Sequence, residues 1–133
     1  MINESDAFKG VIIEESLEDT SILKQLNILA TKIEQVTERH KTPWVKQWTL
    51  HTVKISEKDA KQIAEELSKI IDTKHESSWY TDFKNDKLHY IIFRNKIFLI
   101  DRRNKEQYEE ASKYGISLGI PSYQVNFVRN VVE

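Results

Sequence analysis

Cysteine is absent from this chain of 133 residues, and glycine and proline are scarce, with three and two copies. The absence of cysteine excludes disulfides, thiolate catalysis and zinc sites that need sulfur ligands. Because glycine and proline are rare, turns must be marked mainly by Asn, Asp and Ser. The sequence also lacks a glycine-rich phosphate loop and a GxSxG motif, so nucleotide-dependent chemistry has no support and we predict no cofactor.

The chain also lacks an excess of charge of either sign and any long apolar run. Its 20 basic and 21 acidic residues leave a net charge of −1, so no strong overall field draws it towards nucleic acid or membrane. The longest apolar runs, such as Tyr90 to Phe93, are far too short to span a bilayer. The N-terminal residues do not resemble a signal peptide. We therefore expect a cytoplasmic protein with no membrane partner.

The rest of the composition is typical of a folded protein. Apolar residues make up 39% of the chain and charged residues 31%, which argues against disorder. A chain of this length fits one domain of ordinary size. We predict that residues 1–133 form a single α+β domain with a mainly antiparallel sheet and two principal helices.

Three stretches in the first half of the chain are rich in the β-branched and apolar residues that favour strands. They are Phe8–Leu17, Ile28–Thr37 and Val45–Ile55. The second is ambiguous, because Leu29, Ile33 and Val36 would also share one face of a helix, but we favour the strand. Thr20–Asn27 has apolar residues at helical spacing and predicts a helix of two turns.

Two longer helices are predicted from their N-terminal caps. The hydroxyl of Ser56 is expected to accept a hydrogen bond from the amide of Asp59, ahead of an apolar stripe from Ala60 to Ile71. Asn104 is expected to cap the second helix, with Gln107 as its reciprocal partner.

The second helix and the tail that follows it carry two further expectations. Gly115 is placed where a left-handed helix end would lie. The tail from Ile120 to Val128 contains a short alternating run, which could form an edge strand.

The stretch Trp79–Asp101 predicts three antiparallel strands, with turns at Asn85-Asp86 and at Asn95. A two-residue turn at Asn85-Asp86 places Asp82 directly opposite His89. Apolar side chains fall on both faces, so these strands should be covered on both sides or lie centrally in the sheet. Through Phe83 the element order is that of ferredoxin-like folds, extended by a C-terminal hairpin and helix.

Asp82 and His89 form the candidate reactive pair. Directly opposed residues bring their Cβ atoms to roughly 5 Å, so the carboxylate could orient the imidazole as a general base while Lys84 or Lys87 stabilises anionic charge. No nucleophile is identifiable beside the pair. The alternative, which we favour, is a structural cross-strand pair that satisfies a partly buried histidine.

The segment 39–51 combines cations with aromatic rings. Flat rings and positive charges are what single-stranded nucleic acid needs, and the same rings could line a pocket for a planar small ligand. The candidate ligand-binding residues are Arg39, Lys41, Trp44, Lys46, Trp48 and Tyr80. The alternative is that both tryptophans are core or dimer-interface residues and the cations lie in a solvated loop.

Histidine and carboxylate ligands for a metal are the weakest candidate. His40, His51 and His89 could join Asp82 in a site of nitrogen and oxygen ligands. Because neither HxH nor HExxH spacing occurs, we predict no metal site.

Three segments resemble a small family of uncharacterised prokaryotic proteins with no assigned activity: His40 to Val53, Trp79 to Phe93 and Tyr114 to Val125. The resemblance implies a stand-alone cytosolic domain and transfers no catalytic residue.

These observations leave three functional hypotheses. The first is a non-enzymatic binding module for single-stranded nucleic acid or a planar small ligand, built on the strand with Trp44, Lys46 and Trp48. The second is a small hydrolase or nuclease that uses Asp82 and His89. The third is an interaction protein that forms a homodimer through exposed aromatic side chains.

Overall fold

The computed structural model describes residues 6–37, 46–72 and 79–132. These residues form one six-stranded sheet in the order β2-β3-β1-β4-β5-β6, and every neighbouring pair of strands is antiparallel. The fold is therefore α+β with an antiparallel sheet, as the sequence predicted. The strands are β1 (Phe8–Ile13), β2 (Asn27–Gln35), β3 (Gln47–Ile55), β4 (Tyr80–Lys84), β5 (Leu88–Phe93) and β6 (Lys96–Asp101).

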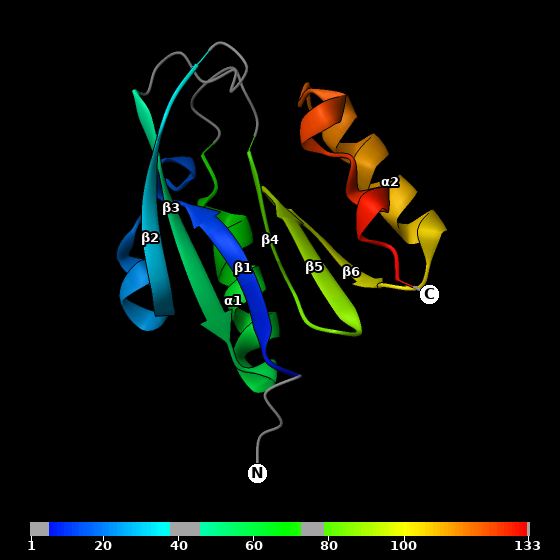
Figure 1. The fold of residues 1–133 in the computed structure, drawn as a ribbon, viewed down its shortest axis with the longest axis horizontal. Helices are drawn as coiled ribbons and strands as arrows, with labels where there is room; N and C mark the ends of the chain where they lie inside the picture. The colour runs from blue at the N-terminus through cyan, green and yellow to red at the C-terminus, as the bar shows by residue number, and fades with distance from the viewer. Residues whose placement is uncertain (1–5, 38–45, 73–78, 133) are drawn as a thin grey trace.

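Two α-helices accompany the described strands, α1 (Glu57–Ile70) and α2 (Lys105–Ser117). Figure 1 shows α1 behind the sheet and α2 beside its β5–β6 end, with the C-terminal tail running next to α2. Four short 3-10 helices complete the described structure: Glu14–Ser16, Ser21–Gln25, Ser122–Gln124 and Phe127–Asn130.

Several local predictions need correction. The helix expected over Thr20–Asn27 is a 3-10 turn at Ser21–Gln25, because β2 begins directly after it at Asn27. The ferredoxin-like order, which needs a helix there, therefore stays a prediction. The strand expected at Ile28–Thr37 is present, but the tail Ile120–Val128 forms 3-10 turns in place of an edge strand.

The helix caps agree with the sequence only in part. The hydroxyl of Ser56 donates to the Asp59 carboxylate over 2.8 Å, and the Asp59 amide bonds to the Ser56 carbonyl oxygen. The Asn104 side chain accepts from the Gln107 amide as expected. The Gln107 side chain reaches back further than expected, to the amide of Asp101 at the end of β6.

Gly115 does not end α2. It lies inside the helix, and a Cβ there would approach the Val125 side chain to 2.8 Å, so close packing explains this glycine. The left-handed residue is Gly119, with φ +92°. Its amide bonds to the Ile116 carbonyl and the Ile120 amide to the Gly115 carbonyl, the pair of hydrogen bonds that closes a Schellman helix end.

Two apolar clusters lie on the two faces of the sheet. The first packs α1 against one face through side chains that include Phe8, Ile12, Val53, Leu67 and Phe83. The second packs α2 and the tail against the other face through side chains that include Ile91, Phe93, Ile100, Tyr108 and Phe127. Both clusters draw on β5, so its prediction as a strand covered on both sides is confirmed.

Candidate functional site

The hairpin that carries Asp82 and His89 has a different register from the predicted one. Asp82 lies opposite Ile91, and His89 lies opposite Lys84. The turn is longer than two residues because the Asn85 side chain accepts hydrogen bonds from the amides of Lys87 (2.9 Å) and Leu88 (2.7 Å). A shift of two residues leaves every side chain on its original face.

Asp82 and His89 consequently still meet, along a diagonal of the hairpin. The Oδ2 atom of Asp82 lies 2.7 Å from Nε2 of His89, and the Tyr108 hydroxyl lies 2.9 Å from Nδ1. Both His89 and Tyr108 are fully buried. Both ring nitrogens of His89 thus bond within the protein and the ring is fully buried, so a substrate in solvent does not reach it in this structure.

The same buried network continues into the C-terminal tail. The Lys84 ammonium donates to the Asn130 side chain over 2.7 Å. The Arg102 guanidinium donates to the backbone carbonyls of Asn85 (2.8 Å) and Asn130 (3.4 Å). Burial raises the pKa of Tyr108, and its hydrogen bond to Arg102 partly opposes that shift. These contacts fasten the tail to β4 directly and, through Arg102, to the turn that follows β4.

Of the six residues proposed for the aromatic and basic site, the structure describes Lys46, Trp48 and Tyr80, and it places Trp48 and Tyr80 against different apolar clusters. Arg39, His40, Lys41 and Trp44 lie outside the described residues. Lys46 is exposed. Trp48 is half-buried and packs on the first apolar cluster, with its ring centroid 5.5 Å from that of Trp79.

Tyr80 belongs to the other cluster. Its hydroxyl donates to the carbonyl of Gln124 over 2.7 Å, and its ring packs edge-on against Phe127 at a centroid distance of 5.0 Å. Burial, followed by the negative charge of Asp82, raises the pKa of Tyr80 to about 12. Tyr80 is therefore committed to fastening the tail.

The strand register reveals a basic feature that the sequence alone did not. Lys9 in β1 lies directly opposite Lys54 in β3 on one side and directly opposite Lys84 in β4 on the other. We call Lys54, Lys9 and Lys84 the lysine ladder. Directly opposed residues share a face of the sheet with their Cβ atoms roughly 5 Å apart. The three positions are distant in the sequence, so only knowledge of the strand pairing could have found them.

More positive charge surrounds one end of the ladder. Burial lowers the pKa of Lys84, and the neighbouring charges of Arg102 and Arg129 lower it further, while Asp82 opposes the shift. Opposed like charges are destabilising in a sheet. The ladder therefore concentrates positive charge on one face of the sheet.

Among the described elements, only α2 and the tail cover the face that carries the ladder, and they cover one end of it. α2 and the tail pack over β5 and β6, and Figure 1 shows them beside that end of the sheet. On the same face as the ladder, Val11 of β1 is 42% exposed and Lys9 is exposed. We call this uncovered part, formed by β2, β3 and β1 on the side away from α1, the open half-face.

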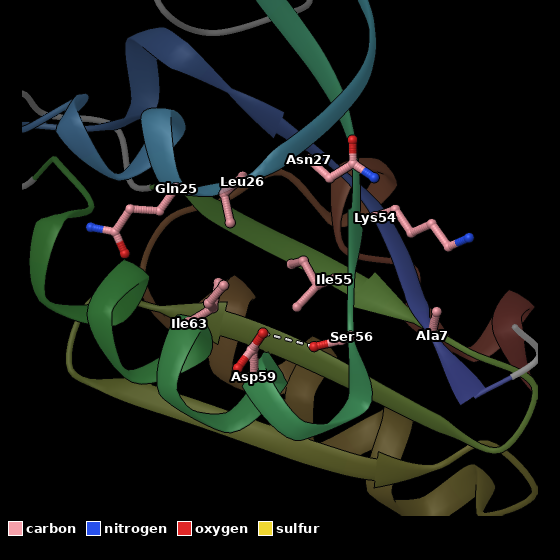
Figure 2. Close-up of a pocket in the computed structure, with 9 residues that line it drawn as sticks. All are labelled: Ala7, Gln25, Leu26, Asn27, Lys54, Ile55, Ser56, Asp59 and Ile63. Atoms are coloured by element: carbon pink, nitrogen blue, oxygen red, sulfur yellow. Dashed lines mark hydrogen bonds between the residues drawn. The ribbon is translucent and has the colours of Figure 1, made fainter. Parts of the chain in front are cut away.

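A shallow cavity of about 400 Å³ lies between the start of β2, the end of β3 and the first turn of α1. Figure 2 shows Leu26, Ile55 and Ile63 facing one another, with the Lys54 side chain pointing away from Ile63. No described aromatic residue lines this cavity, so it lends no support to stacking of a planar ligand.

No group of three or more His, Asp or Glu side chains within residues 6–37, 46–72 and 79–132 could hold a metal ion. His51 and His89 lie on opposite faces of the sheet, because His51 shares its face with Val53 in the α1 cluster. The ring of His51 is hydrogen-bonded to Thr31 (2.9 Å) and Glu14 (3.1 Å). No described helix is long and apolar enough to cross a membrane.

Comparisons with known protein families, curated proteins and solved structures find no match to this chain. The resemblance to an uncharacterised prokaryotic family therefore stays a prediction, and function must be argued from the site alone.

Proposed function

We propose that this protein is a non-enzymatic binding module whose open half-face takes the phosphate backbone of single-stranded nucleic acid. The observation that carries the proposal is the lysine ladder, in which Lys9 is opposed on both sides by another lysine. A phosphate that lies over Lys9 and Lys54 would neutralise part of their positive charge, whereas Lys84 already donates to Asn130. Release of counterions from the nucleic acid would add to the affinity.

The shape of the surface favours a single strand over a duplex. A duplex is read mainly by an element that enters a groove, whereas the open half-face is a sheet surface. Sheet surfaces bind unpaired bases when the backbone follows positive charge and the bases meet apolar side chains. Val11 lies two residues after Lys9 on the same face of β1, opposite Asp82. Its exposed side chain offers such an apolar contact.

The charge on the molecule as a whole does not oppose this proposal. The net charge of −1 rules out long-range attraction, so binding must depend on local contacts and fall steeply with salt. Lys46 is also exposed, on the segment that precedes β3. Arg39 and Lys41, which the sequence also proposed for this site, lie outside the described residues.

The hydrolase hypothesis has weaker support. His89 is fully buried, and both of its ring nitrogens have partners within 2.9 Å. A general base must reach the proton that it removes. The arrangement around Asp82 and His89 is better explained as a structural pair that positions the tail.

Two further proposals concern the setting of this function. We propose a cytoplasmic location, in keeping with a chain that has no cysteine to oxidise.

We also propose a distant ferredoxin-like relationship for the first four strands, since their order β2-β3-β1-β4 is compatible with that arrangement once the first helix is reduced to a 3-10 turn.

The test is a titration of a short fluorescein-labelled oligouridylate with the protein, followed by anisotropy at several salt concentrations. We expect Lys9→Gln and Lys54→Gln each to weaken binding and to lower the slope of log K against log salt by about 0.7, the value for one phosphate of a single strand. Lys61→Gln, on the exposed face of α1, is the matched control and should change neither quantity.

Two results would overturn the proposal. One is the absence of binding by the wild-type protein at low salt. The other is an equal loss of affinity in Lys61→Gln and Lys9→Gln, because the interaction would then be a general attraction to any lysine on the surface.

A further inference from the structure

β2 is one of the two edge strands of the described sheet and is the least covered element of the described structure. It spans nine residues, and only Glu34 among them is even partly buried. Ile33 is 56% exposed and Leu29 is 50% exposed. Natural proteins usually shorten, charge or cover an edge strand of this length, because its unpaired backbone groups invite another strand. No described strand pairs with its outer edge.

The hydrogen bonds to β3 determine which residues of β2 offer their backbone to that outer edge. The Val36 amide donates to the Lys46 carbonyl over 3.0 Å. Hydrogen-bonded and non-hydrogen-bonded pairs alternate in an antiparallel ladder. The amides and carbonyls of Glu34 and Lys32 therefore point towards β3, and those of Thr31, Ile33 and Gln35 point outwards.

We propose that a second copy of this chain pairs with β2, antiparallel, about a two-fold axis at Ile33. In this register Ile33 lies opposite Ile33 of the second copy, and Thr31 lies opposite its Gln35. All of these residues present outward backbone groups, so the hydrogen bonds are reciprocal. The most exposed large apolar side chain of the described residues then packs against its own equivalent.

Charge complementarity selects this register. It places Lys32 opposite Glu34 of the second copy, and Glu34 opposite the second Lys32, so two opposite-charge pairs form on one face. In a register with the axis at Lys32, the Lys32 residues of the two copies lie opposite each other. In a register with the axis at Glu34, the two Glu34 carboxylates lie opposite each other. Like charges directly opposite each other disfavour both slips.

The β-bulge in β2 disfavours an axis nearer the start of the strand. The register with β3 shifts between Ile28 and Ala30, which leaves Leu29 as the extra residue. A bulge interrupts regular pairing, so an axis closer to Asn27 would bring the bulge into the new ladder. The regular part of the strand is centred close to Ile33.

Pairing of this kind would also join the two sheets into one. Opposed residues share a face, so the open half-faces of the two copies would lie side by side. The inference does not depend on nucleic-acid binding, because it rests only on the edge of β2.

The experiment uses the absence of cysteine from the natural chain. Ile33→Cys places one thiol on the proposed axis, at a separation that suits a disulfide. We expect mild oxidation to convert most chains to a species of twice the 15.7 kDa chain mass. Leu99→Cys, at a position that is 49% exposed on the opposite edge strand β6, is the control and should remain mostly monomeric.

A charge exchange tests the register without a cross-link. Sedimentation velocity of the wild-type protein should show a dimer. Lys32→Glu and Glu34→Lys should each weaken it at least about tenfold, and the double exchange should restore it. A wild-type protein that stays monomeric at high micromolar concentration would overturn the proposal, as would equal cross-linking of the two cysteine variants. Single reversals without effect would overturn the register.

Discussion

The two halves of the sheet are built on different principles. β5, in the covered half, has five of its six residues buried, whereas β2, in the open half, has eight of its nine residues exposed. β5 has helices or tail on both faces. β2 pairs with β3 alone among the described strands. A strand of high β-propensity can therefore serve either as core or as surface, and its neighbours decide which.

The same contrast holds for the polar residues. In the covered half, Asp82, His89 and Tyr108 satisfy one another within the protein, so their chemistry is used in folding. In the open half-face, Lys9 is opposed only by other lysines on its two neighbouring strands. The polar groups of the covered half thus have their partners within the chain, and the proposed function supplies an external partner for Lys9 and Lys54.

The largest expected difference between the halves is in the cost of removing an apolar side chain. Phe93 is fully buried, and its ring packs with those of Tyr80, Tyr114 and Phe127 at centroid distances of 6.0, 5.0 and 6.4 Å. Phe93→Ala should lower the free energy of unfolding by about 3–5 kcal/mol in urea titrations. Val11→Ala, in the open half-face, should cost less than about 1 kcal/mol. Similar losses in both variants would mean that the open half-face is covered.

The covered half should also lose stability at alkaline pH. The pKa of Tyr80 is raised to about 12 from an ordinary value of 10.0, so the folded state holds this proton more tightly than the unfolded state. The contribution of protonated Tyr80 to the free energy of unfolding is complete below about pH 10 and is lost as pH rises through about 12. The full loss amounts to about 2–3 kcal/mol.

Tyr80→Phe should remove this part of the pH dependence. Unfolding free energies of the variant and the wild type should converge as pH rises from 9 towards about 12. Lys84 has a lowered pKa and acts in the opposite direction, but it is present in both proteins and cancels in the difference. Tyr123→Phe, at a tyrosine that is 43% exposed, is the control. A constant difference across this pH range would show that Tyr80 ionises freely in the folded protein.

The smallest expected effect is a gain in the free energy of unfolding, in contrast to the losses above, and it concerns the open half-face. Lys9→Gln removes both direct oppositions in the lysine ladder, so it should raise the free energy of unfolding at low salt by about 0.2–1 kcal/mol. At 1 M salt the gain should vanish, because the Debye length falls to about 3 Å. A variant that is more stable and binds nucleic acid less well would mark Lys9 as a functional residue. A loss of stability would show that the lysine is held by a favourable contact.

The amino-acid sequence by itself determined the parts of this protein that depend on local pattern. Residues that favour strands located those around Val53 and Ile91, and the spacing from Ala60 to Leu67 located the long helix. It also placed Asp82 and His89 on one face, since a register error of two residues leaves the faces unchanged. The contact between Asp82 and His89 was therefore predicted from their shared face, whereas the diagonal arrangement of the pair was not.

Only the tertiary structure decided which surfaces remain available. The turn at Asn85 was lengthened by side-chain hydrogen bonds that a residue pattern does not reveal, and the long-range order of strands brought Lys9 between Lys54 and Lys84. Gly119, with its positive φ, forms the helix end expected at Gly115, and Gly115 lies inside the helix, where a Cβ would approach the Val125 side chain to 2.8 Å. Each of these outcomes depends on contacts between residues distant in the chain, and local propensity carries no information about them.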